Sequence, residues 1–157
     1  MKQITFPDVA ALASQAQQSP RLRANRNLHE ELADPIQRLA IAMEPATYVR
    51  VHRHPHTWEL LTPLSGRFVV LNFDNTGKVT QRTVLGEDCP ILETPANCWH
   101  AVLSLDVGGV IFEVKHGPYQ PIAEYDYWPA SPPEGDAQVV ATLQWYAQAQ
   151  VGDVLPW

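Results

Sequence analysis

Short apolar and alternating runs occupy most of the chain between residues 36 and 116, and turn-forming residues separate them. Runs rich in Val, Ile, Leu and aromatic residues predict β-strands over residues 36–43, 47–54, 58–64, 67–73, 78–85, 91–94, 98–105 and 110–116. Ser65-Gly66 and Asp74-Asn75-Thr76-Gly77 are typical of tight turns between antiparallel strands. About eight short strands separated by Gly and Pro favour a β-barrel or a β-sandwich.

Helical periodicity occurs near both ends of the chain. Residues 5–18 carry an apolar stripe after the start Thr5-Phe6-Pro7-Asp8, and Ser19-Pro20 ends this predicted helix. A second helix is predicted from Ala137 to about Gln150, with Asp136 as its cap. We therefore expect an all-β chain with short N-terminal and C-terminal helices.

Two longer segments show no regular period. Residues 21–34 are polar and are predicted to form a loop, in which Asn25, Asn27 and His29 either make solvated turns or face a pocket. Residues 117–136 are rich in Pro and aromatic residues, which excludes a regular helix. We expect this second segment to cross the barrel, where its rings either pack at the edge of the core or cover a site.

Length and composition fit a single globular domain of 157 residues, of which 45% are hydrophobic and 18% charged. We divide it into an N-terminal helix with a polar loop (1–35), a β-barrel (36–116), and a Pro-rich aromatic segment with a C-terminal helix (117–157). The two cysteines, Cys89 and Cys98, are too few for a disulfide framework. Because there is no leader-like pattern and no apolar run near the ~18 residues that span a membrane, we expect no membrane association and a cytoplasmic location.

The charge distribution limits the class of partner. A formal net charge of −6 argues against nucleic acid, because binding to phosphates needs a basic surface. Six of the 11 Lys and Arg residues nevertheless lie between residues 21 and 53. An anionic small-molecule ligand therefore stays open.

The most informative chemistry lies between residues 47 and 66. In a strand over residues 47–54, alternation places Tyr48, Arg50, His52 and His54 on one face, which is expected to line a cavity. Two convergent imidazoles followed by the carboxylate of Glu59 suit zinc, iron, manganese, nickel or cobalt. Such a site needs a further ligand from elsewhere in the chain, and the best candidate is His100.

The spacing of these residues resembles the two motifs of the cupin superfamily. The first motif is matched by His52-x-His54, four residues, Glu59, six residues and Gly66. The second is matched by Pro95-Ala96-Asn97-Cys98-Trp99-His100, where Asn97 replaces the usual Gly. Asn is a mild departure, because it tolerates the left-handed backbone conformation better than other non-Gly residues. The resemblance implies a single cupin domain, a small jelly-roll-like β-barrel, with His52, His54, Glu59 and His100 as ligands of one divalent metal.

Residues outside these motifs are similar to the WbuC-type cupin-fold metalloproteins, whose genes often lie in bacterial O-antigen and polysaccharide clusters. They are Arg23-Ala24-Asn25-Arg26-Asn27-Leu28-His29, Gln37-Arg38, Pro45-Ala46-Thr47-Tyr48-Val49 and Phe112-Glu113-Val114-Lys115-His116-Gly117-Pro118-Tyr119. Val51 departs from the Pro usual in that family, and His56 stands at a variable position, where we place it at the rim of the site. The resemblance implies a sugar or nucleotide-sugar ligand, bound by Asn25, Asn27, His29, Arg38 and Arg50.

Several roles stay open at this point. Arg38 stands on a mostly apolar strand face, so it either forms a structural ion pair or anchors an anion. Glu59 is either a metal ligand or a base, and Tyr48 and Arg38 are the further catalytic candidates. The activity is expected to resemble a sugar isomerase or epimerase, with an iron-dependent dioxygenase and a non-catalytic binding module as alternatives. Because cupins commonly pair, we also expect a homodimer.

Overall fold

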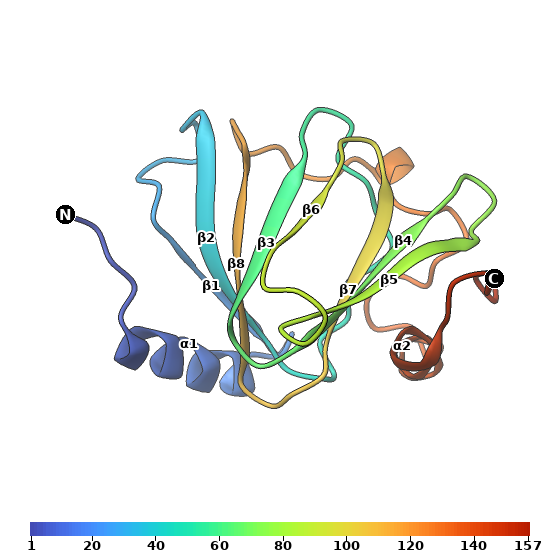
Figure 1. The fold of residues 1–157 in the computed structure, drawn as a ribbon, viewed down its shortest axis with the longest axis horizontal. Coiled ribbons are helices and arrows are strands. Elements are labelled where there is room, and N and C mark those ends of the chain that lie inside the picture. The colour runs from blue at the N-terminus through green and yellow to red at the C-terminus, as the bar shows by residue number, and fades with distance from the viewer.

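The computed structural model describes residues 1–157 and consists of two antiparallel β-sheets with one α-helix packed on each side (Figure 1). The larger sheet has the strand order β1-β2-β8-β3-β6, and the smaller sheet has the order β5-β4-β7. The strands are Arg23–Asn27 (β1), Ile36–Met43 (β2), Glu59–Ser65 (β3), Phe68–Phe73 (β4), Val79–Leu85 (β5), Leu92–Thr94 (β6), Trp99–Ser104 (β7) and Gly109–His116 (β8). This jelly-roll-like sandwich confirms the predicted all-β class.

Strand β4 shows how the sequence builds the core, because all six of its residues are buried. Phe68 and Val70 point into an apolar cluster between the two sheets, together with Leu61 of β3 and Ile111 of β8. The alternate residues of β4 belong to a second cluster under the C-terminal part of the chain, which includes Tyr146. A strand that is covered on both faces has a nearly continuous apolar sequence, as this one does.

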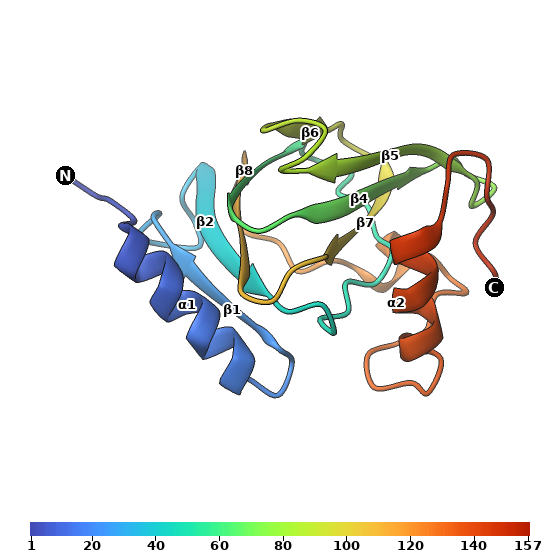
Figure 2. The ribbon, with the colours of Figure 1, turned by 60° about the horizontal axis from the view of Figure 1, so that its bottom comes forward.

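The N-terminal helix α1 (Phe6–Gln18) begins and ends where the sequence predicts. Thr5 and Asp8 form a reciprocal capping box at its start. Leu12 and Ala16 are buried against the outer face of the larger sheet, where Ala40 and Ala42 of β2 supply small side chains. Figure 2 shows α1 lying along β1 and β2. The outer face of β2 is therefore a helix-packing surface.

The C-terminal helix α2 (Val139–Gln148) is shorter than predicted and lies beside the smaller sheet (Figure 2). Asp136 accepts a hydrogen bond from the backbone N–H of Gln138, so it organises the turn before the helix instead of capping it directly. Tyr146 is the largest fully buried side chain and fixes α2 to the core. No helix of the protein reaches the length and apolarity needed to cross a membrane.

Two of the predicted elements are wrong. Residues 23–27 form β1, an edge strand paired with β2, although their polar composition predicts a loop. The expected strand over residues 47–54 is irregular, and only His52 forms isolated bridges, with His100 and Tyr127. This segment runs between β7 and the 117–136 segment and takes backbone partners from both. It therefore cannot pair along its length in one sheet.

Residues 117–136 run across the end of the sandwich and include the short 3-10 helix η1 (Glu124–Asp126). Some aromatic residues of this segment pack at the edge of the core, and others line a cavity. Trp128 packs edge-to-face on Trp99 at the margin of the core, with ring centroids 5.3 Å apart. Tyr119 and Tyr127, in contrast, line a cavity.

Candidate metal centre and cavity

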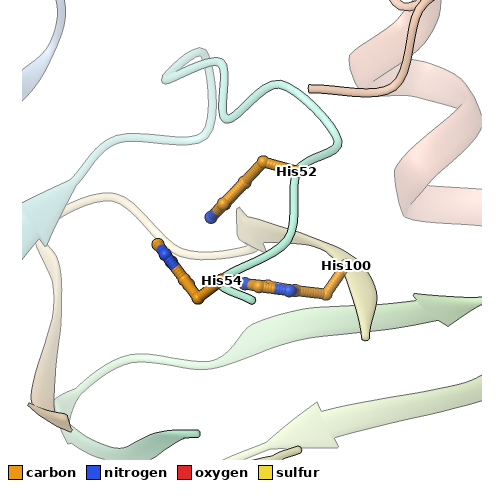
Figure 3. A group of neighbouring side chains, drawn as sticks. All are labelled: His52, His54 and His100. Carbon is orange, nitrogen blue, oxygen red and sulfur yellow. The ribbon is translucent and has the colours of Figure 1, made fainter. Parts of the chain in front are cut away.

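Three buried histidines converge at one point between the sheets. His52 and His54 come from the irregular segment before β3, and His100 comes from β7 (Figure 3). One ring nitrogen from each lies within 4.8 Å of the others. The ring centroid of His52 lies 4.9 Å from that of His54 and 4.3 Å from that of His100. This spacing allows three imidazole nitrogens to reach a single cation.

Backbone contacts hold two of these rings in a metal-binding tautomer. The His52 and His100 backbones exchange two N–H···O bonds of 3.0 and 2.8 Å. The Nδ1 of His52 lies 2.8 Å from the carbonyl oxygen of Arg50, and the Nδ1 of His100 lies 3.0 Å from that of Cys98. A carbonyl oxygen can only accept, so each Nδ1 carries the donated proton. In the neutral ring the Nε2 lone pair is then free to bind a metal.

Glu59, the first residue of β3, places its carboxylate beside two of the histidines. Its Oε1 lies 3.4 Å from His54 Nε2, and its Oε2 lies 3.2 Å from His100 Nε2. Both distances are within the range of an ion pair, but both Nε2 atoms are buried without a hydrogen-bond partner. Buried nitrogens of this kind are costly unless something satisfies them. Three imidazoles and a carboxylate are a donor set that fits a divalent transition metal.

Electrostatics favour cation binding at this point. Burial, reinforced by the neighbouring imidazoles of His100 and His54, lowers the pKa of His52 well below its ordinary value. Burial also lowers the pKa of His54, against the effect of Glu59. The pKa of Glu59 lies well below its usual range: burial opposes ionisation, but His100, His54 and Lys115 outweigh it. Burial likewise opposes the charged form of His100, but Glu59 raises the pKa of His100, so a proton and a metal cation compete for its Nε2.

Two charged residues of β8, Glu113 and Lys115, extend the site, although the sequence alone predicts no role for them. Lys115 Nζ lies 2.8 Å from Glu113 Oε1 and 3.4 Å from Glu59 Oε1. Burial and the charge of Glu59 raise the pKa of Glu113 to about 8, against the effect of Lys115. Burial opposes the charged form of Lys115, but Glu113 and Glu59 together raise its pKa. The sequence did contain an indication of this pair. Glu113 and Lys115 are two positions apart in a mostly apolar strand, so they share a face with Ile111.

His52, His54 and Glu59 line a cavity of about 780 Å³. One wall is polar and comes from β1 and its flanking residues: Arg21, Arg23, Asn25, Asn27 and His29. The floor is apolar and comes from β2, β3 and β8: Leu39, Ile41, Met43, Leu61 and Ile111. The 117–136 segment closes another side with Tyr119, Ile122, Tyr127, Pro133 and Glu134. The cavity is within the usual size range of a small-molecule binding site.

Four of the five residues expected to bind a ligand line the cavity: Asn25, Asn27, His29 and Arg50. Asn25 and Asn27 lie at its exposed rim, joined by a 3.0 Å side-chain hydrogen bond. His29 is buried; its Nδ1 accepts the backbone N–H of Arg38 at 3.0 Å, and its Nε2 has no partner. Arg50 also lines the cavity, where its guanidinium lies 4.7 Å from the ring centroid of Tyr127.

The placement of Arg38 and Tyr48 at the site is corrected by the structure. Arg38 lies on the outer face of β2 with Ala40, and it pairs with Asp34 at 3.6 Å, so the ion-pair alternative describes it. Tyr48 points into the core, where its hydroxyl donates to the carbonyl oxygen of Pro132 at 2.9 Å. Neither side chain lines the cavity. The orientation expected for Tyr48 relied on a regular alternation, which residues 47–54 do not keep. Arg38 does follow the alternation of β2, but it lies on the face that packs against α1.

Two further candidates lie outside the cluster. His56 is exposed, with its ring centroid 6.4 Å from that of His54, and it is not one of the three convergent histidines. Cys98 is a free, half-buried thiol that contacts Asn72 instead of the histidines.

Comparison with known families identifies the chain. A family described as "Domain of unknown function (DUF6016)" matches residues 4–85, which is 82 of the 157 residues. The chain belongs to this family. The DUF6016 match contains His52, His54 and Glu59 and ends before His100. No curated protein sequence shows significant similarity to the chain.

Solved structures show the fold of this DUF6016 protein. TT1209 from Thermus thermophilus is 16% identical with a TM-score of 0.55, covering 74% of this chain and 97% of its own. An oxalate oxidase in complex with glycolate is 14% identical (TM-score 0.54; 68% of this chain, 57% of its own). The DMSP lyase DddQ from Ruegeria pomeroyi DSS-3 is 20% identical (TM-score 0.51; 66% of this chain, 52% of its own). These likenesses show a cupin fold, and they do not single out the WbuC-type proteins.

Proposed function

We propose that this protein is a metal-dependent cupin in which His52, His54, His100 and Glu59 hold one divalent transition metal. The observation that carries the proposal is the convergence of three buried histidines whose ring nitrogens lie within 4.8 Å of one another. The unpartnered Nε2 atoms of His54 and His100 support it, because a metal would satisfy both. When bound, a divalent metal supplies a Lewis acid that polarises an oxygen atom of the ligand. Zinc, iron, manganese and nickel all suit this donor set.

The walls of the cavity favour a sugar or nucleotide-sugar as the ligand. The amides of Asn25 and Asn27 and the imidazole of His29 offer hydrogen bonds to hydroxyl groups. Tyr119 and Tyr127 offer flat apolar faces on another side. Arg50 also lines the cavity, where its guanidinium donates to Ser131, Glu124 and the carbonyl oxygen of Trp128. A cavity with polar edges and apolar faces suits a sugar ring, which itself has both.

The remaining parts of the proposal rest on the sequence resemblance. A role in bacterial O-antigen or polysaccharide metabolism, with isomerase- or epimerase-like chemistry, agrees with the WbuC-type residues described above. A homodimer and a cytoplasmic location also remain predictions. The names of the structural neighbours include an oxidase and a lyase, so the fold itself does not select a reaction.

Metal content of purified variants tests the site. The protein should be prepared without a His tag and without added metal, and compared with a variant in which Ala replaces both His52 and His100. We expect near-stoichiometric metal in the wild type and almost none in the double variant. His56→Ala, which removes an exposed histidine from the same segment, is the matched control and should keep its metal. Full metal content in the double variant would show that the assignment is wrong.

Oxygen uptake and ligand screening separate the possible activities. Iron together with oxygen uptake would favour the dioxygenase alternative. Zinc, manganese or nickel without uptake would favour the sugar-directed activity, and nucleotide sugars should then raise the melting temperature. Turnover that depends on the identity of the metal would indicate an enzyme, whereas binding that is insensitive to it would indicate a binding module.

A further inference from the structure

A continuous row of buried charged groups leads from the histidines to β8. Glu59 of β3 and Lys115 of β8 are directly opposite each other in the antiparallel pairing, so their side chains share a face. Lys115 Nζ lies 3.4 Å from Glu59 Oε1 and 2.8 Å from Glu113 Oε1. Glu113 and Glu59 are both buried, and the Lys115 side chain is only 18% exposed. The ammonium therefore contacts two buried acidic side chains beside the three histidines.

A contribution to stability does not by itself explain why Lys115 and Glu113 are buried together. Moving an ammonium and a carboxylate out of water costs several kcal/mol for each ion, and apolar residues of similar volume often stabilise a protein as well or better. The surrounding floor of the cavity is apolar, so an apolar pair would fit it. The position of Lys115 within reach of Glu59 offers another reason.

We propose that Lys115, held in place by Glu113, is a positioning residue that fixes the Glu59 carboxylate toward the histidines. The inference rests on the proposed metal site and deepens it. One oxygen of Glu59 faces Lys115 and His54, and the other faces His100. From the β8 side, the ammonium of Lys115 is the cation that contacts the Glu59 carboxylate. Residues that orient a metal ligand in this way typically contribute about 10- to 100-fold to metal affinity.

The test is Co²⁺ binding to protein that has been stripped of metal, followed by visible absorption. The main variant combines Lys115→Met with Glu113→Gln, which removes the ammonium together with the buried acid that contacts it. We expect Co²⁺ affinity to fall about 10- to 100-fold, with a changed absorption band. Lys115→Arg, which keeps a cation beside both carboxylates, should largely restore affinity and spectrum.

The same pair of substitutions in a Glu59→Gln background separates positioning from a general structural effect. If Lys115 acts through Glu59, Lys115→Met with Glu113→Gln should cause no further loss of Co²⁺ affinity in the Glu59→Gln protein. Wild-type affinity and spectrum in the main variant, or an equal loss in the Glu59→Gln background, would overturn the inference. If the main variant does not fold, Lys115→Gln alone serves the same comparison. Failure of the wild type to bind Co²⁺ would instead overturn the proposed metal site itself.

Discussion

Asn97 shows at the scale of one residue how the backbone positions the site. Its φ is +63°, in the left-handed region, at the turn that leads into β7. Its backbone N–H donates to the carbonyl oxygen of His54 at 2.9 Å. The turn before His100 is therefore tied directly to another of the histidines. Asn is among the few non-Gly residues that adopt this conformation without a large penalty.

The stability of variants at position 97 should follow the preference of the new residue for the left-handed backbone conformation. We predict that Asn97→Ala lowers the free energy of unfolding by about 1 kcal/mol, because Ala incurs the full left-handed penalty. Asn97→Gly should be as stable as the wild type or nearly so. Urea unfolding of both variants measures the difference. An Ala variant as stable as the Gly variant would contradict this account of the turn.

The sequence predicted the part of the site that depends on residues close together in the chain or on motif spacing. His52 and His54 could be placed together because they are two positions apart, and motif spacing added Glu59 and His100. The structure does bring these four residues together. Lys115 could not be placed, because its role depends on the pairing of β3 with β8, and the sequence does not give the register.

At the scale of elements, β1 connects the N-terminal helix with the cavity. On its outer side, Arg26 forms an ion pair with Asp8 of α1. On its inner side, Arg23, Asn25 and Asn27 line the cavity. The sequence does not predict this strand, because neither of its faces carries an apolar alternation. An edge strand with a polar cavity on one side and a helix on the other does not need one.

The capping carboxylate of α1 gives a pH-dependent prediction. Hydrogen bonds from Thr5, together with Arg26, lower the pKa of Asp8 from 3.8 to about 2. Because the pKa is lower in the folded state, the contribution of Asp8 to stability is present above about pH 4 and is lost as the pH falls toward 2. Asp8→Asn should therefore be less stable than the wild type at about pH 6, and the gap should narrow at about pH 3.

Urea unfolding of both proteins at the two pH values measures the gap. The charge-removing variant Glu31→Gln, at an exposed side chain, controls for general effects of charge. A gap that stays constant between the two pH values would show that ionised Asp8 does not stabilise α1.

At the scale of the whole molecule, the 117–136 segment closes the cavity and is held by arginines from the histidine-bearing segment. Arg53, between His52 and His54, binds the Asp126 carboxylate at 2.9 Å, and its backbone N–H donates to the Asp126 carbonyl oxygen at 3.0 Å. Its guanidinium also lies 4.5 Å from the Trp99 ring centroid. The wall of the cavity and the histidine-bearing segment are thus joined through one side chain.

We predict that Asp126→Asn lowers the free energy of unfolding by about 2 kcal/mol, because it weakens a largely buried, charge-assisted pair. Glu124→Gln is the matched control, since it removes an ion pair to Arg50 in the same segment but at a side chain that is 83% exposed. Its effect should stay below about 1 kcal/mol. Equal effects in denaturant unfolding would contradict a special role for the Arg53–Asp126 pair.

The fold class was predictable because short strands and turn residues alternate along the chain, and seven of the eight predicted strands are present. The missing one, residues 47–54, has the right composition but divides its backbone partners between β7 and the 117–136 segment. That division depends on contacts far apart in sequence. Residue patterns report local preference, so they could not reveal it.

The most direct measurement is an anomalous-scattering difference map from crystals of the metal-loaded protein, recorded at the absorption edge of the bound metal. We predict one strong peak about 2.0–2.3 Å from a ring nitrogen of each of His52, His54 and His100, with a Glu59 oxygen at similar range. A map with no peak among the three histidines, or with the metal bound by other residues, would contradict the central claim.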